Sequence, residues 1–149
     1  MATTLNLYDQ WRDIVADPTR AAAIAGTLKC AIVAAGYTPD QNLHDFFNDI
    51  TNEVTGTGYT AGGNACASPS WTGPDGAGLL TFDDSDPATW TQNAAGFSNG
   101  RRAIFYYDTG TSSTSRLVAY TADFGADSGN VAGDFSVAIN AAGIYTSAR

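Results

Sequence analysis

The stretch from Tyr37 to Gly63 constrains the fold of this chain more than any other part of its sequence. It begins with Thr38-Pro39-Asp40, where proline fixes the backbone φ angle and removes a hydrogen-bond donor. Four glycines between positions 56 and 63 later return the chain to extended structure. Apolar residues at helical spacing predict a short amphipathic helix near residues 41–52, inserted between β segments: Leu43, Phe46, Phe47 and Ile50.

Short segments with strand character, separated by turn signals, fill most of the remaining sequence. They alternate in polarity or are rich in β-branched and aromatic residues. A loop is expected between them at 83–87. About eight strands at this spacing predict a mostly β fold, an antiparallel sandwich or barrel. The expected strands lie near 28–34, 58–71, 78–82, 88–91, 102–107, 117–124, 135–139 and 144–145.

Residues 1–27 are predicted to form a partly helical N-terminal arm ahead of a single β domain at 28–149. Asp17-Pro18 is typical of a helix start, and Gly26 of a helix end. The arm has little apolar bulk and could either pack on the main domain or reach out to a neighbour, where Trp11 is a candidate intermolecular anchor. One helical face of residues 5–16 carries its apolar side chains: Leu7, Trp11, Ile14 and Val15.

The composition limits the classes of partner. The 149 residues are 44% hydrophobic, which is enough for one folded core. A formal net charge of -8 argues against nucleic-acid and membrane-surface partners, since phosphates need compensating cations. That charge serves either solubility or steering toward a basic partner surface. No secretory signal and no apolar run of membrane-spanning length are visible, so we expect a soluble protein made in the cytosol.

Catalytic chemistry is not expected from this sequence, and no catalytic or cofactor-binding residue is assigned. The only histidine, His44, lies in the predicted helix, and no serine sits in a nucleophile elbow. Glu53 is the only glutamate. Asp108 and Asp123 flank a predicted hairpin and could face each other as a carboxylate pair, but aspartates in turns are far commoner than catalytic pairs.

Three further sets of residues are candidates for metal or redox chemistry. Asp83, Asp84 and Asp86 cluster oxygen ligands that suit calcium, but they lack the EF-hand spacing. Cys30 and Cys66 are either buried thiols or a bridge formed in an oxidising medium. We therefore predict no bound metal or cofactor. A weaker acidic group consists of Asp123, Asp127 and Asp134.

Aromatic residues on the predicted strands have two interpretations. They could build a binding face, or they could fill the core, because about half of the side chains on strands point inward. The residues in question are Trp71, Trp90, Tyr106, Tyr107 and Tyr120.

Five segments carry a resemblance to a known family: LKCAIVAAGYTPDQNLHDFFNDI, NEVTGTGYTAGG, FDDSDPATW, RRAIFYYDTGTSSTSRLVAYTADFG and FSVAINAAGIYT. In their order and amino-acid sequence, these segments are similar to small virion proteins of tailed bacteriophages, which are encoded among head and tail genes. The resemblance covers residues 28–149. The two cysteines and the loop at 98–101 depart from the family pattern.

The resemblance implies a non-enzymatic capsid decoration, or cement, protein on the outside of the virion, made in the host bacterial cytoplasm. Such a protein would bind the major capsid protein, bridge neighbouring subunits as a dimer or trimer, and stabilise the shell. Tyr8, Trp11 and Ile14 of the arm would clamp an adjacent subunit. The alternatives are a tail or head-tail adaptor component and, in another class, a calcium- or carbohydrate-binding attachment module.

Overall fold

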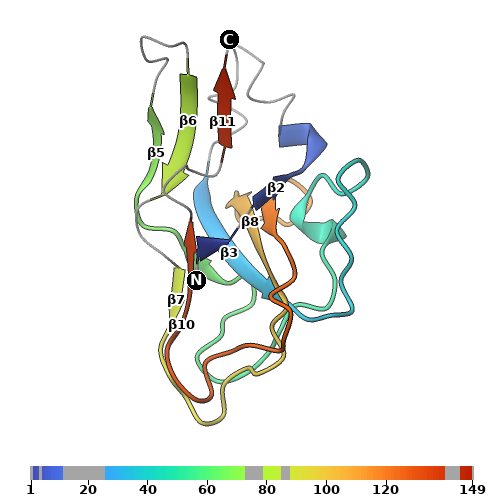
Figure 1. Cartoon of the computed structure of the whole chain (residues 1–149). Coiled ribbons are helices and arrows are strands. Elements are labelled where there is room, and N and C mark those ends of the chain that lie inside the picture. Colours follow the sequence, from blue (N-terminus) through green and yellow to red (C-terminus); the bar gives the residue numbers. More distant parts are fainter. Residues whose placement is uncertain are drawn as a thin grey trace.

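The computed structural model describes residues 2–3, 5–11, 26–72, 79–84, 88–139 and 145–148. Within them the chain forms eleven strands in three sheets, with two short helical turns, at residues 9–11 and 47–49 (Figure 1). None of these sheets closes into a barrel, and the mostly β, sandwich-like fold expected from the sequence is confirmed. No described helix combines the length and apolar character needed to cross a membrane.

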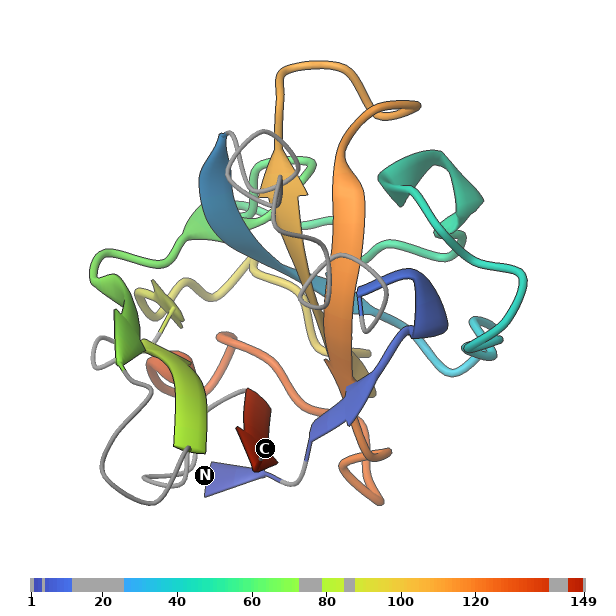
Figure 2. The same cartoon turned by 90° about the horizontal axis from the view of Figure 1, so that it is seen from above.

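The largest sheet has five strands, and all of its pairings are antiparallel. Strands β3, β8 and β9 run side by side through the middle of the molecule (Figure 2). Strand β3 pairs with β8 along its whole length, from Thr27 opposite Asp108 to Val33 opposite Arg102. In spatial order the strands are β2 (Leu5–Leu7), β9 (Arg116–Thr121), β8 (Arg102–Asp108), β3 (Thr27–Val33) and β4 (Asn64–Ala65).

Two smaller sheets complete the fold. Strand β1 pairs in parallel with β10, which pairs antiparallel with β7. Strand β6 lies between β11 and β5, and both of its pairings are antiparallel. The bounds are β1 (Ala2–Thr3), β10 (Phe135–Ile139), β7 (Ala88–Trp90), β11 (Tyr145–Ala148), β6 (Leu79–Asp84) and β5 (Pro69–Thr72).

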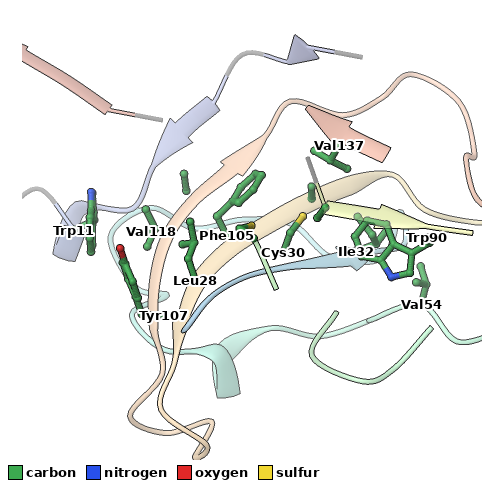
Figure 3. Close-up of a cluster of buried hydrophobic side chains, with 14 of the residues drawn as sticks. Trp11, Leu28, Cys30, Ile32, Val54, Trp90, Phe105, Tyr107, Val118 and Val137 are labelled. Atoms are coloured by element: carbon green, nitrogen blue, oxygen red, sulfur yellow. The ribbon is translucent and has the colours of Figure 1, made fainter. Parts of the chain in front are cut away.

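Side chains are buried on both faces of the five-stranded sheet. Along β3, Leu28, Cys30 and Ile32 belong to one buried cluster, and Ala31 and Val33 belong to another. This period of two is the alternation of a strand, and burial on both faces explains why β8 is almost continuously apolar. The first cluster also contains residues of the smaller β7–β10 sheet and the loop before β8 (Figure 3): Trp90, Phe97 and Val137.

The N-terminal arm differs from its prediction. Leu5–Leu7 is a strand rather than the start of a helix, because its backbone pairs with β9, and only residues 9–11 are helical among those described. Ala2–Thr3 pairs with β10 instead, so the first residues of the chain join two different sheets. The second predicted helix, from Asp17 to Gly26, falls almost entirely outside the described residues.

The predicted helix near 41–52 shrinks to one 3-10 turn, η1 (Phe47–Asp49). The backbone N–H groups of Phe47 and Asn48 donate to Ser115 and Ser112 of the β8–β9 hairpin tip, rather than continuing a helix. The Asp49 carboxylate accepts from the N–H groups of residues 45 and 46, which also fixes a turn. Tertiary pairing and local aspartate bonds therefore override the helical periodicity.

Two strand boundaries also change. The strand predicted at 58–71 begins only at residue 64, because Gly58, Gly62 and Gly63 adopt positive φ angles and turn the chain. It is also divided into β4, which pairs with β3, and β5, which pairs with β6. Strand β6 extends to Asp84, where it pairs with Pro69, so Asp83 and Asp84 are not in the predicted loop.

Candidate functional site

Two of the three residues predicted to clamp a neighbouring subunit do not lie on the surface. Tyr8 and Trp11 are fully buried in this chain's own core. The Tyr8 hydroxyl is 2.9 Å from that of Tyr37, and the Trp11 ring stacks on Tyr107 with centroids 5.7 Å apart. Their burial gives no support to an exposed interface at Tyr8 and Trp11, so the subunit contact stays a prediction, and Ile14 lies outside the described residues.

The acidic residues considered for metal binding do not form a site in the part of the chain that the structure describes. No group of three potential ligands is found there. Arg101 pairs with Asp123 at 2.7 Å and with Asp127 at 3.4 Å, whereas Asp134 accepts from the Gln92 backbone. The side chains of Asp83 and Asp84, and all of Asp86, fall outside the described parts.

The carboxylates of Asp108 and Asp123 do not face each other. Asp108 ends β8 and pairs with Lys29, whereas Asp123 follows β9 and pairs with Arg101, which precedes β8. They therefore lie at opposite ends of the hairpin. The Gly125 backbone N–H and then the Arg101 guanidinium lower the pKa of Asp123.

His44 belongs to a small hydrogen-bond network. Its Nδ1 lies 2.9 Å from the Tyr37 hydroxyl and accepts from the Asp40 backbone N–H at 3.3 Å. Burial raises the pKa of Tyr37 to about 12 and that of Tyr8 still higher. The network joins the turn at 40–44 to the core.

The aromatic residues on the strands are mainly core. Trp90, Tyr106 and Tyr107 are buried, and Tyr120 is half-buried against the Tyr8 ring. The side chain of Trp71 is not among those described. The proposal of an aromatic binding face is therefore not supported by the side chains that the structure describes.

A cleft of about 230 Å³ lies at the end of β8, where the 108–115 hairpin tip meets the loop at 53–62. We call it the Glu53 cleft. Its lining combines a cation, two carboxylates and aromatic rings: Lys29, Glu53, Asp108, Phe47 and Tyr106. Sequence reasoning missed this site, since its residues come from β3, η1, two loops and β8, and no local pattern joins them.

An ion pair forms one wall of the Glu53 cleft. Lys29 Nζ lies 2.6 Å from Asp108 Oδ2. The other oxygen, Asp108 Oδ1, accepts from the Gly110 backbone at 2.9 Å and from the Ser115 hydroxyl at 3.3 Å. Lys29 first, and then the Gly110 N–H, lower the pKa of Asp108. This carboxylate is therefore ionised and satisfied at neutral pH.

Glu53 also lines the cleft, and two short hydrogen bonds fix its carboxylate. Its Oε1 accepts from the Tyr59 hydroxyl at 2.7 Å and from the Gly62 backbone N–H at 2.6 Å. The Tyr59 hydroxyl in turn accepts from the Ile32 backbone at 2.9 Å. Burial and the neighbouring Glu53 charge raise the pKa of Tyr59, so it remains a neutral donor.

Aromatic packing closes the inner side of the cleft. The Phe47 ring stacks on Tyr106 with centroids 4.1 Å apart and planes at 18°. The Tyr106 hydroxyl donates to the Gly62 carbonyl at 2.7 Å. Burial raises the pKa of Tyr106. The aromatic pair therefore holds η1 against the sheet and fixes the loop that carries Glu53.

A second hollow of about 420 Å³ lies between the loops before β8 and before β10. Small residues and Phe135 line it, and Asp127, its one charged lining residue, is paired with Arg101. It therefore offers less specific chemistry than the Glu53 cleft.

The known proteins offer no template for this site. Comparison of the chain with protein-family models, curated proteins and solved structures gives no match.

Proposed function

We propose that this chain is a structural protein of a tailed-phage virion. In this proposal it decorates the outer surface of the head, binds the major capsid protein and bridges neighbouring subunits to stabilise the shell. The sequence resemblance over residues 28–149 motivates the assignment. Repetition over many equivalent sites makes individually weak contacts collectively strong.

One structural observation supports this proposal: the long irregular loops of the protein are packed tightly against one another. Backbone around Gly56, Gly96-Phe97 and Gly129-Asn130 meets in what we call the loop junction. Asn130 is fully buried there, accepts from the Phe97 N–H at 3.0 Å and donates to the Thr91 carbonyl at 2.8 Å. A surface that is rigid before docking loses little conformational entropy on binding.

Charge and one exposed side chain support the same role. The net charge of -8 favours a basic partner surface. Leu43 is 74% exposed, the only large hydrophobic residue so exposed among those described. Its backbone N–H donates to the Asp40 carboxylate at 3.1 Å, which holds its turn in one shape. A fixed apolar side chain suits a contact with another protein.

Electron cryo-microscopy of purified virions tests the proposal by locating and counting copies of this chain. Many copies on the head lattice, each touching more than one capsid subunit, are the expected result. A few copies at the portal or along the tail would favour the adaptor or tail alternative. Absence from the particle would reject a structural role in the virion.

A further inference from the structure

The charges around the Glu53 cleft do not balance. Lys29 and Asp108 neutralise each other at 2.6 Å. Glu53 has no ion-pair partner among the described residues, so the cleft keeps one net negative charge. An unbalanced carboxylate in a partly enclosed site attracts a cation more strongly than one in open water.

The hydrogen bonds of Glu53 leave room for a further donor. Both bonds that the structure gives to its carboxylate, from Tyr59 and Gly62, reach the same oxygen, Oε1. A carboxylate has about four acceptor positions on its two oxygens. Within the described part of the chain, no donor reaches Oε2, and this oxygen is free for a ligand.

We infer that the Glu53 cleft binds the end of a lysine or arginine side chain of a protein partner. The ammonium or guanidinium group donates to Glu53, and the apolar stem lies along Phe47 and Ala61, which also line the cleft. The volume of about 230 Å³ suits one long side chain rather than a folded segment. An aromatic ring in the wall adds to the attraction for a cation.

Other ligand chemistries fit these residues less well. A phosphate or carboxylate would meet Glu53 without a spare cation, because Lys29 is already held by Asp108. A neutral sugar would leave the negative charge uncompensated. The chain as a whole carries -8, so its field also steers basic surfaces toward it. The identity of the partner as the capsid protein rests on the proposed function; binding of a cationic side chain to the cleft does not.

The first experiment titrates the full chain with Nα-acetyl-lysine amide and follows backbone amide shifts by NMR. We expect saturable shifts at Gly62 and Gly110, which line the cleft. Nα-acetyl-norleucine amide has a similar stem without the charge and should cause no saturable shift there. Equal responses to both probes, or saturable binding of N-acetylglucosamine in place of the cation, would overturn the inference.

The variant Glu53→Gln keeps an Oε1 acceptor for Tyr59 and Gly62 but removes the charge. It should weaken binding of the lysine probe about tenfold or more, because a charge-assisted bond is lost. Asp45→Asn changes net charge equally at a residue outside the cleft lining and should bind like wild type. Unchanged binding by a folded Glu53→Gln chain would contradict the inference.

A second measurement separates this inference from the proposed function. Virions lacking the chain are incubated with wild-type or Glu53→Gln protein, and bound copies are counted. Reduced decoration by the variant alone supports both ideas. Equal decoration by both rejects the cleft as the capsid contact and leaves the virion role intact. If wild type binds the lysine probe but not virions, the cleft inference stands and the virion role fails.

Discussion

The loop junction lies among the loops around Gly56, Gly96 and Gly129, whereas the Glu53 cleft is lined by Tyr106 and Asp108 toward the end of β8, and irregular backbone contributes to both. In the loop junction, added Cβ atoms at Gly56, Gly96 and Gly129 would all overlap neighbouring atoms. Around the cleft, Lys29 and Asp108 keep side chains that are 28% and 23% exposed. One region is closed by backbone contact, and the other is lined by partly solvated charges.

We expect this difference to separate residues that determine stability, at the loop junction, from residues that determine binding, at the cleft. At the loop junction, buried polar groups satisfy one another, so a change there leaves a void, a clash or an unpaired group. At the cleft, water can replace a lost partner, so the same kind of change costs little folding free energy. We therefore expect loop-junction variants to lower the free energy of unfolding, and cleft variants to change which ligands the protein binds.

The largest effect is expected for Gly129→Ala. The added methyl would overlap the Phe97 carbonyl and lie 2.9 Å from Ser98 Cα, and backbone atoms cannot rotate away. We expect a loss of about 3 kcal/mol in the free energy of unfolding, measured by urea denaturation. Gly133→Ala is the matched control, since nothing lies within 4 Å of its Cβ, and it should change stability by less than about 0.5 kcal/mol. Equal losses of stability in Gly129→Ala and Gly133→Ala would show that close backbone contact is not what makes the loop junction sensitive.

Asn130→Ala should have the next largest effect. It leaves the Phe97 N–H and the Thr91 carbonyl without the side-chain partners that they have at 3.0 and 2.8 Å. The expected cost is about 2–3 kcal/mol in thermal or urea unfolding. Asn93→Ala provides the control, because the Asn93 side chain accepts an exposed bond, from the Ala95 N–H at 2.9 Å. If both variants lose the same stability, burial is not what makes the junction costly to disturb.

The sequence predicts the strands far better than either region. Alternation along β3 and the apolar run of β8 report local backbone geometry, so their positions were predicted closely. The helix at 41–52 failed because the Phe47 and Asn48 N–H groups pair with a hairpin more than 60 residues away in sequence. Hydrogen bonds to a distant hairpin change the structure of this segment but leave no sign in its own hydrophobic pattern.

The same limit applies to the two sites. In the sequence, Glu53 was notable only as the single glutamate. Its hydrogen-bond donors, Tyr59 and Gly62, are held in position by turns whose geometry cannot be predicted from composition. The loop junction needs three glycines from three loops to meet, which no single segment records. Tyr8 and Trp11 are completely buried, which the sequence did not decide, because an arm with few apolar residues can either pack on its own domain or reach a neighbour.

A smaller effect on stability is expected from Tyr37→Phe, which tests the hydrogen-bond network of Tyr8, Tyr37 and His44. Burial raises the pKa of Tyr37 to about 12, compared with about 10 in an unfolded chain. The contribution of Tyr37 to stability should therefore be constant below about pH 10 and fall between about pH 10 and pH 12, where the unfolded state loses its proton first. Tyr37→Phe should cost about 1 kcal/mol at neutral pH and make this alkaline decline shallower. An identical alkaline slope in urea titrations would show that Tyr37 ionises equally in both states.

The smallest stability effect should come from Asp108→Asn in the Glu53 cleft. Lys29 lowers the pKa of Asp108, so the pair's contribution is present above the unfolded value of about 3.9 and is lost as pH falls through the folded value. The variant should lose less than about 1 kcal/mol at neutral pH, because both side chains are partly exposed, and its stability should decline less below about pH 4. It should also release Lys29 to oppose Glu53's attraction for a cation, so binding of the lysine probe weakens although the fold persists. A loss of stability as large as that of Asn130→Ala, without a change in probe binding, would contradict the division between the loop junction and the Glu53 cleft.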